Sequence, residues 1–363
     1  MPDTKVEIIG VVAPGFEQVT DVFARHFETG QELGARFTLC REGEVILDLW
    51  AGHADKGKTR PFDQTTLTPV FSTGKAVAAL MIARLVDEGR LDYQQPVADV
   101  WPEFAAAGKA GVTVEQALSH QAGIAGLNGP MSLKDWYDWD GVCARIAAAE
   151  PLWPPGTAGG YHPVTVGFIA GEIFRRIDGR MMNVAVAEDL AAPFGLDLRI
   201  GLDAKDRPRV PEMERPKAFA KFGPMTDILS LAFFSPWSQP GGGDPGQARA
   251  APIPSTNTHA TAQALARLMS VMACGGQLAG KPFLSARTVR AAAEAKVRDR
   301  DLVLPFDIAW AAGFMRNEGL NIWGPGRETV GHAGWGGSCA SADPETRLSG
   351  AYVLNRQSPH LIG

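Results

Sequence analysis

The sequence predicts an α/β fold of the α+β type. One antiparallel sheet is built from both chain ends and flanked by helices, and a mainly helical region is inserted between the ends. Strand patterns rich in apolar and β-branched residues occur near both ends, at residues 35–50 and 338–354. Helical periodicity and long Gly/Pro-rich stretches fill the middle of the chain. Because strands must pair with one another, a single sheet completed by both ends is the most economical topology.

The N-terminal part of the chain contains a helix, a hairpin and a second helix. Residues 16–29 repeat phenylalanine and valine at helical spacing. Residues 35–40 and 45–50 flank a glycine-containing turn, which predicts a β-hairpin. Residues 73–88 are rich in Ala, Val, Leu and Met and are followed by Gly89, which predicts a long helix with a glycine after its end.

The middle of the chain differs from its ends. Pro/Gly-rich loops at residues 153–157 and 239–246 separate shorter helical segments. We therefore expect a sheet-and-helix domain made of residues 1–90 plus 300–363, with residues 91–299 as the inserted region. The expected helices of the middle lie at residues 114–118, 167–177, 181–190 and 261–272, and the expected strands near the C-terminus lie at residues 308–315, 338–342 and 350–354.

The composition excludes several classes of partner. The 363 residues are 45% hydrophobic and 21% charged, which is typical of a soluble globular protein. The formal net charge is −5 and the basic clusters are short, so we expect no nucleic-acid partner. The sequence has no run of about 20 apolar residues and no leader-like start, so we expect no membrane association and a cytoplasmic location.

The metal-ligating residue types are scattered along the chain. The four cysteines form no CxxC pair, and the seven histidines form no HExxH motif. We therefore expect no metal and no cofactor. The composition does not indicate an oligomeric state.

The segment Ser72-Thr73-Gly74-Lys75 opens the predicted long helix. Residues three apart in a helix have Cβ atoms about 5–6 Å apart, so Lys75 can reach the hydroxyl of Ser72. A serine needs a base to become a nucleophile, and a desolvated lysine can be that base. The helix N-terminus also offers the Ser72 N–H to a developing oxyanion. An S-x-x-K sequence is common by chance, and Ser72 acting only as a helix cap fits the same residues.

Four blocks around and beyond this motif strengthen the catalytic interpretation. The blocks are residues 70–77 (VFSTGKAV) with 85–92 (LVDEGRLD), residues 112–124 (VTVEQALSHQAGI), residues 154–157 (PPGT) with 160–164 (GYHPV) and 167–173 (GFIAGEI), and residues 330–338 (VGHAGWGGS) with 342–345 (ADPE). In this order they resemble the serine β-lactamase and penicillin-binding-protein superfamily, in its class C type. The resemblance covers most of the chain and implies a β-lactamase/transpeptidase-like fold.

The resemblance assigns catalytic roles by position. Ser72 matches the nucleophile and Lys75 the general base. Tyr161 matches the family's tyrosine, which moves protons to the leaving group and from the deacylating water. A phenol can do this if nearby positive charge, such as that of Lys75, favours the phenolate, and the two groups would then titrate as a pair.

The third motif is expected on the strand that borders the site. His332-Ala333-Gly334 falls where β-lactamases have Lys-Thr-Gly. The resemblance therefore implies a substrate-binding role for His332, Ala333, Gly334 and Trp335. It also implies an oxyanion hole made of the N–H groups of Ser72 and Trp335. A purely structural, hydrogen-bonded His332 and a Trp335 side chain that forms a pocket wall are alternatives.

Two departures from the β-lactamase pattern favour ester substrates. Pro163 replaces the asparagine that contacts the antibiotic's amide, and His332 replaces the lysine that helps to bind its carboxylate. An imidazole is a poorer anion anchor than an ammonium group. Both changes resemble family VIII carboxylesterases, so we expect a serine hydrolase that cleaves small-molecule carboxylic esters.

Other functions stay open on the same scaffold. A β-lactamase, a D-amino-acid peptidase and an acyltransferase would share the acyl-enzyme. A non-catalytic penicillin-binding-like protein is disfavoured because serine, lysine and tyrosine occur together. The pocket walls are expected from residues 126–139 and 222–247, whose aromatic residues favour apolar substrates. These aromatic residues are Trp136, Tyr137, Trp139, Phe233, Phe234 and Trp237.

Overall fold

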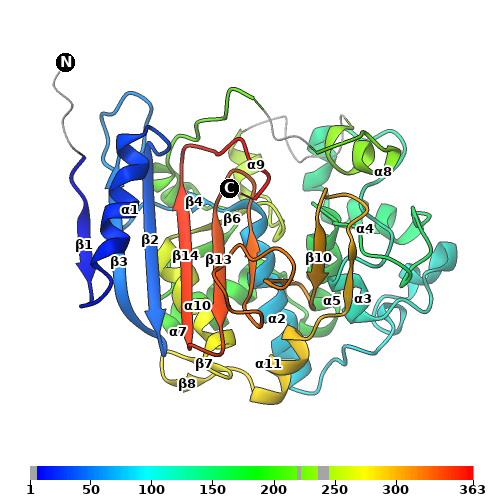
Figure 1. Cartoon of the computed structure of the whole chain (residues 1–363). Coiled ribbons are helices and arrows are strands. Elements are labelled where there is room, and N and C mark those ends of the chain that lie inside the picture. The colour runs from blue at the N-terminus through cyan, green and yellow to red at the C-terminus, as the bar shows by residue number, and fades with distance from the viewer. Residues whose placement is uncertain (1–5, 219–221, 236–244, 363) are drawn as a thin grey trace.

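The dominant element is a nine-stranded sheet in which every neighbouring pair is antiparallel (Figure 1). The computed structural model describes residues 6–218, 222–235 and 245–362. The strand order is β1-β3-β2-β14-β13-β12-β11-β10-β9. The C-terminal strand β14 (Leu348–Leu354) therefore lies between the N-terminal strand β2 (Gly34–Arg41) and β13 (Cys339–Asp343). This arrangement confirms the expected mixed α/β fold with one antiparallel sheet built from both ends.

The remaining elements have the following bounds. The other strands of the sheet are β1 (Ile9–Val12), β3 (Glu44–Gly52), β9 (Val297–Arg300), β10 (Asp307–Trp310), β11 (Met315–Arg316) and β12 (Val330–Ala333). A small three-stranded sheet has the order β4 (Thr68–Pro69), β6 (Thr258–Ala260) and β5 (Leu198–Ile200). A separate two-stranded sheet consists of β7 (Gln277–Leu278) and β8 (Lys281–Pro282). The helices are α1 (Glu17–Glu28), α2 (Lys75–Asp87), α3 (Val114–Leu118), α4 (Trp139–Ala148), α5 (Thr165–Asp178), α6 (Met182–Ala185), α7 (Ala192–Phe194), α8 (Asp227–Leu229), α9 (Pro245–Ala250), α10 (Ala262–Ala273) and α11 (Ala286–Ala293).

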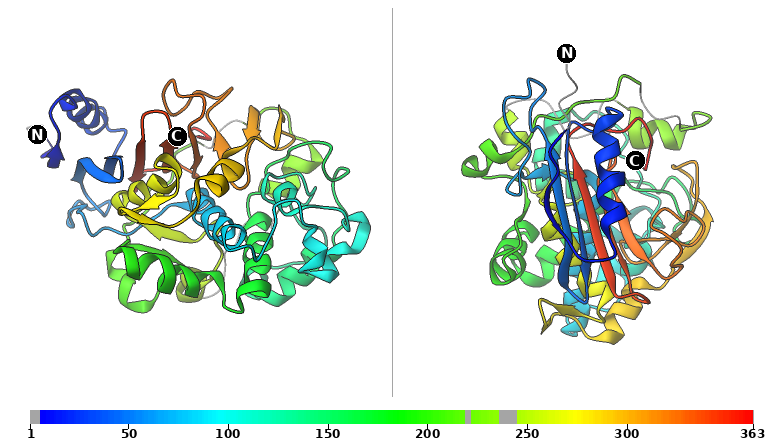
Figure 2. Two further views of the ribbon diagram at one scale, coloured as in Figure 1. Left: turned by 90° about the horizontal axis from the view of Figure 1, so that it is seen from below. Right: turned by 60° about the vertical axis from the view of Figure 1, so that its left-hand side comes forward.

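Both faces of the large sheet are covered by helices. Alternate residues of a strand point to opposite faces. Ala35 of β2 packs with Phe23 and Phe27 of α1, whereas Cys40 belongs to the main core on the other face, where α10 lies on β14, β2 and β13. Figure 2 shows α1 on the outer face of the sheet and the remaining helices on the opposite side.

Helix α2 runs through the centre of the molecule and is almost completely buried. It is apolar on all sides, as expected of a helix surrounded by protein. It contacts α5, α11 and β12, so it joins the sheet to the helical region. A buried central helix is a rigid support for the residues at its N-terminus.

Two sequence expectations about element bounds were wrong. The helix expected from residue 73 begins at Lys75, and Phe71–Gly74 form a 3₁₀ turn, η1. A tight turn lets Gly74 lie directly against Thr258, where a Cβ would come within 2.2 Å of the threonine hydroxyl. The strand expected at residues 308–315 is two strands, β10 and β11. They are separated by a turn at Gly313, whose φ of 86° favours glycine.

The packing of α10 does not follow the expected division of the chain into a sheet-and-helix domain and an inserted region. Its residues were assigned to the inserted region, yet α10 packs on four strands of the large sheet, β2, β3, β13 and β14. The strands β1 and β9 were not expected, because each has only four residues and neither shows a clear alternation of apolar and polar residues. Within the described part of the chain, no helix combines the length and the apolar character needed to cross a membrane.

Candidate active site

The turn η1 presents Ser72 at the N-terminal end of α2. The residue before the serine, Phe71, has a φ of 47°, which is an uncommon backbone conformation for a residue with a large side chain. The turn is fixed to the small sheet because Val70 donates its N–H to the carbonyl of Thr258 at 2.9 Å. Strained residues of this kind persist only where the surroundings hold them, and they concentrate at functional sites.

The turn η1 is also fixed to the loop that follows β12. The hydroxyl of Thr73 donates to the carbonyl of Ser338 at 3.1 Å, and the hydroxyl of Ser338 donates to the carbonyl of Val70 at 2.9 Å. Gly334 approaches so closely that a Cβ there would lie 2.3 Å from the Val70 carbonyl oxygen. Ser72 and the third motif are thereby held at a fixed separation.

Lys75 is buried directly behind Ser72. Its Nζ lies 2.8 Å from the Ser72 Oγ, 2.8 Å from the carbonyl of Pro163 and 3.1 Å from the carbonyl of Ser255. All three acceptors are uncharged, and among the described residues no carboxylate forms an ion pair with Lys75. Burial therefore lowers the pKa of Lys75 well below its usual value. The neutral amine can accept a proton from Ser72.

Tyr161 contacts the same oxygen from the other side. Its hydroxyl donates to the Ser72 Oγ at 2.6 Å, and the Lys75 Nζ lies 4.9 Å from the centre of its ring. Burial nevertheless raises the pKa of Tyr161 above its usual value, and the charge of Asp301 raises it further. The expected stabilisation of a phenolate by Lys75 is therefore outweighed, and the resting tyrosine is a proton donor.

Asp301 holds Tyr161 in place from behind. Its Oδ1 accepts hydrogen bonds from the N–H groups of Tyr161, Val303 and Leu304 at 3.0, 2.9 and 2.8 Å. Its Oδ2 accepts a 2.9 Å hydrogen bond from the indole N–H of Trp310. The Trp310 ring in turn lies parallel to the Tyr161 ring, with 5.5 Å between centroids and 7° between planes. One carboxylate thus orients both the backbone and the stacking partner of Tyr161.

His332 on β12 is buried and electrically neutral. Burial, with the nearby charge of Lys75, lowers the pKa of His332 to about 3. Its Nδ1 lies 2.7 Å from the carbonyl of Ala333, so Nδ1 carries the proton and Nε2 is an acceptor. Nε2 is buried, and no residue in the described part of the chain forms a hydrogen bond with it. His332 therefore offers a substrate an uncharged acceptor, where a lysine would offer a cation.

A cavity of about 680 Å³ opens over Ser72. Six of the predicted site residues line it: Ser72, Tyr161, His332, Ala333, Gly334 and Trp335. The seventh, Lys75, lies just behind Ser72. The structure thus brings together all the residues that the sequence motifs selected.

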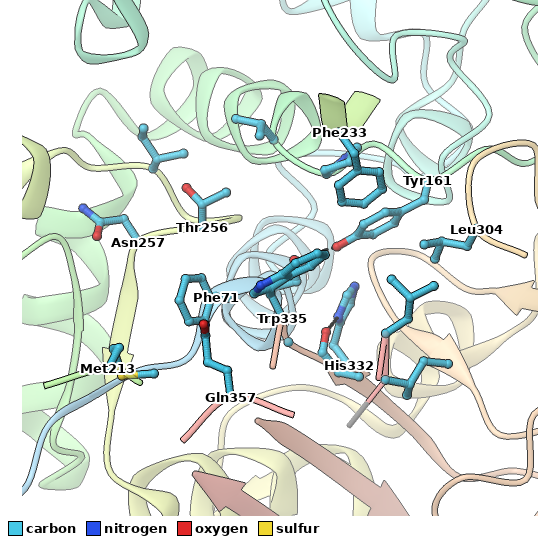
Figure 3. A pocket seen from close by; sticks show the side chains of 18 of the residues that line it. Phe71, Tyr161, Met213, Phe233, Thr256, Asn257, Leu304, His332, Trp335 and Gln357 are labelled. Atoms are coloured by element: carbon cyan, nitrogen blue, oxygen red, sulfur yellow. Dashed lines mark hydrogen bonds between the residues drawn. The ribbon is translucent and has the colours of Figure 1, made fainter. Parts of the chain in front are cut away.

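The cavity has two ends with different character. In Figure 3, Tyr161, Leu304 and His332 lie on one side of Trp335, and Thr256 and Asn257 lie on the other. The first side is mostly apolar and aromatic, with Phe233, Trp310 and Met315 also in its wall. The second side carries Thr256 and Asn257 (Figure 3). Arg249, which also lines the cavity, adjoins this side because its carbonyl accepts a hydrogen bond from the Asn257 amide. Arg215, another lining residue, follows two residues after Met213, which Figure 3 shows on the same side.

The expected aromatic walls are present in part. Tyr137, Phe233 and Phe234 line the cavity. Trp136 and Trp139 instead pack against Phe168 of α5 and belong to the core beneath the loop. Trp237 lies outside the described residues.

Sequence reasoning missed the residues that orient Lys75 and Tyr161. Asp301, Trp310 and Ser255 belong to none of the recognised motifs, and they lie at least 90 residues from Tyr161 along the chain. Only the three-dimensional pairing shows that they serve one site. The signal available was Asp301 itself, the last residue of a charged run (residues 298–301) before an apolar segment (residues 302–304), and it does not stand out in the sequence.

The fold and this serine–lysine–tyrosine cluster define the class of serine β-lactamases and penicillin-binding proteins. Residues 19–361 match the family model described as Beta-lactamase, so the chain belongs to that family. The match is to the family as a whole and does not single out its class C type.

Individual relatives cover nearly the whole chain. The Esterase/beta-lactamase LipL of Mycobacterium tuberculosis is 34% identical over 99% of this chain and 86% of its own length. A structure described as a novel penicillin-binding protein homolog from Caulobacter crescentus is 54% identical, with a TM-score of 0.95 over 98% of this chain and 95% of that one. A structure of a family VIII carboxylesterase is 40% identical, with a TM-score of 0.91 over 98% and 96%.

Proposed function

We propose that this protein is a carboxylesterase that forms an acyl-enzyme on Ser72. The observation that carries the proposal is the position of the Ser72 Oγ. It lies in the wall of a largely apolar cavity, within hydrogen-bond distance of both Lys75 and Tyr161. Relatives named as esterases, over nearly the full chain, support the same class.

In the acylation step, the Ser72 Oγ attacks the ester carbonyl carbon. The proton of Ser72 passes to the neutral amine of Lys75, which becomes an ammonium group. The N–H groups of Ser72 and Trp335 would stabilise the negative oxygen of the tetrahedral intermediate. When the carbon–oxygen bond of the ester breaks, the Tyr161 hydroxyl gives its proton to the departing alkoxide, and Lys75 returns the proton to Tyr161.

Deacylation reverses these transfers with water as the nucleophile. Water attacks the acyl carbon, its proton passes through Tyr161 to Lys75, and Ser72 leaves with a proton. An alcohol in place of water would give acyl transfer to that alcohol. The short separation between the three side chains supports direct proton transfer without an additional relay group.

The residues around Ser72 favour an ester over a β-lactam. An uncharged His332 offers no cation to the antibiotic's carboxylate, and Pro163 uses its carbonyl to hold Lys75. Lost contacts of these two kinds are worth about 1.5–3 and about 0.5–1.5 kcal/mol. Together they would reduce kcat/KM for a cephalosporin by roughly 10² to 10³.

The test compares kcat/KM of the purified protein for a short-chain p-nitrophenyl ester and for a chromogenic cephalosporin. We expect ester hydrolysis to be faster by at least two orders of magnitude. Ser72→Ala should abolish both activities and labelling by a fluorophosphonate, with an unchanged melting temperature, because only one oxygen atom is removed. Near-normal turnover by Ser72→Ala would contradict the proposal.

A second candidate is a penicillin-binding or β-lactamase function. The names of two close relatives favour it, since one includes beta-lactamase and the other penicillin-binding protein. Comparable kcat/KM values for the cephalosporin and the ester would place this candidate first. Slow acylation by the antibiotic without turnover would indicate binding without hydrolysis.

A further inference from the structure

We infer that the preferred ester carries a carboxylate, which binds at the polar end of the cavity between Arg215 and Arg249. The inference rests on the proposed esterase function and adds the chemical class of the substrate. In such a molecule, the ester group lies over Ser72, an apolar part fills the aromatic side, and the anion extends to the side of Asn257.

The charge of the cavity wall is one-sided. Arg215 and Arg249 both line the cavity. No aspartate or glutamate is among the described residues that line it. This bias is notable in a chain whose net charge is −5. A concave, largely apolar wall with charge of one sign concentrates ligands of the opposite sign.

The two guanidinium groups have no side-chain partner among the described residues. In the described part of the chain, neither forms an ion pair or a side-chain hydrogen bond within the protein. The acidic residues that precede Arg215 are already paired, Glu212 with Lys56 at 3.1 Å and Glu214 with Arg356 at 2.9 Å. Both cations are therefore available to a ligand.

Neutral polar groups complete the same end. The hydroxyl of Thr256 is buried and has no hydrogen-bond partner among the described residues. Asn257 is held rigidly, since its side-chain amide donates to the carbonyls of residues 248, 249 and 251. This attachment links Asn257 to the backbone of Arg249. Figure 3 shows Thr256 and Asn257 facing the cavity, on the opposite side of Trp335 from His332.

The polar end of the cavity lies apart from the third motif, residues 332–334. The resemblance to β-lactamases would place an antibiotic's carboxylate at His332, which is neutral here. Asn257, which is hydrogen-bonded to the Arg249 carbonyl, and Met213, which precedes Arg215 by two residues, lie on the other side of Trp335 from His332 (Figure 3). An anionic ester therefore fits the charge distribution of this cavity in a way that a β-lactam bound in the family's orientation does not.

The probes are two matched pairs of esters. The first pair carries the charge on the acyl part: mono(4-nitrophenyl) adipate against 4-nitrophenyl hexanoate. The second pair carries it on the alcohol part: 4-acetoxybenzoate against 4-acetoxybenzamide. For each pair, the readout is the ratio of kcat/KM for the anionic ester to kcat/KM for the neutral ester.

We expect the double variant Arg215→Gln/Arg249→Gln to lower this ratio about three- to tenfold for at least one pair, because exposed ion pairs contribute modestly. Arg215→Lys/Arg249→Lys keeps the charges and should retain most of the ratio. Arg145→Gln is the matched control, since Arg145 is an exposed arginine of α4 that does not line the cavity. Raising the ionic strength should lower the wild-type ratio as well.

The outcomes separate the two proposals. If neutral esters are not hydrolysed and Ser72 is not labelled by a fluorophosphonate, the proposed esterase function fails. If neutral esters are hydrolysed but neither ratio changes in the double glutamine variant, the carboxylate-binding inference alone is overturned. It is also overturned if both anionic esters resist hydrolysis, or if Arg145→Gln lowers the ratio as much as the double variant.

Discussion

At the scale of single residues, the site depends on a lysine that is buried without a counter-charge. The three acceptors around the Lys75 Nζ are a hydroxyl and two carbonyls, so hydrogen bonds orient the amine but do not neutralise a charge on it. Tyr161 responds to the same burial in the opposite sense, because its charged form is the deprotonated one. Burial thus keeps both groups uncharged and ready to exchange a proton.

This reasoning predicts how activity depends on pH. The active form of Lys75 is the neutral amine, so kcat/KM for an ester should fall as the pH decreases through the pKa of Lys75. Because that pKa is lowered, the midpoint should lie well below the usual lysine value, and Tyr161 should cause no loss of activity up to about pH 9. A rate that decreases steadily between pH 6 and pH 9 would contradict this assignment.

The corresponding variant is Lys75→Arg. Arginine stays protonated and cannot accept the proton of Ser72, so kcat/KM should fall by more than tenfold, or about 1.4 kcal/mol in the transition state. Lys109→Arg is the control, since Lys109 is also buried and donates to two carbonyls, those of Ala106 and Ala149, away from the site. If both variants lose activity equally, the loss reports general damage and not the absence of a base.

The sequence was sufficient to predict which side chains meet at the site, but not their protonation states. The spacing of Ser72 and Lys75 and the motif around Tyr161 predicted which side chains would meet. The uncharged state of His332 and the protonated state of Tyr161 depend on burial, which arises from segments far away in sequence. Burial raises the pKa of Tyr161, whereas the sequence alone pointed only to Lys75 as a charge that would favour the phenolate.

At the scale of elements, the segment from Asp301 to Trp310 acts as a support for the tyrosine. Burial raises the pKa of Asp301, although its four N–H donors favour the charged form. The segment contributes Leu304 and Trp310 to the cavity and holds the Tyr161 backbone through Asp301. The sequence did not predict this, because a short carboxylate-centred loop has no periodic pattern.

We predict that Asp301→Asn lowers kcat about 10- to 100-fold with a smaller change in KM, as expected for loss of a charged hydrogen bond worth about 1.5–3 kcal/mol. The asparagine NH₂ would face either the Trp310 indole N–H or the three backbone N–H groups, and it cannot accept from them. In a Trp310→Phe background, the cost of Asp301→Asn should be smaller, because one of the donors is gone. Equal costs in both backgrounds would exclude coupling through Trp310.

At the scale of the whole molecule, the two chain ends depend on each other. Strand β14 pairs with β2 along seven residues and with β13 along five. The sequence predicted this closure, because strand patterns were confined to the ends of the chain. It did not predict that the sheet extends to β9, or that α10 covers one face, since these pairings join segments without strong local patterns.

Removing β14 should therefore prevent folding altogether, and not only lower the stability of the folded protein. A truncation that lacks residues 348–363 leaves β2 and β13 with unpaired edges and removes the buried Val353 from the core. We expect no cooperative thermal unfolding by circular dichroism and no labelling of Ser72 by a fluorophosphonate.

A shorter truncation after Ser358 is the matched control. It keeps β14 and the hydrogen bond from the Ser358 N–H to the carbonyl of Gly336, but removes Leu361 and Ile362 from the cavity wall. This variant should unfold cooperatively at nearly the wild-type temperature and still label at Ser72, with a higher KM for apolar esters because apolar contact area is lost. If the longer truncation also unfolded cooperatively near the wild-type temperature, closure of the sheet by the two chain ends would not be what stabilises this fold.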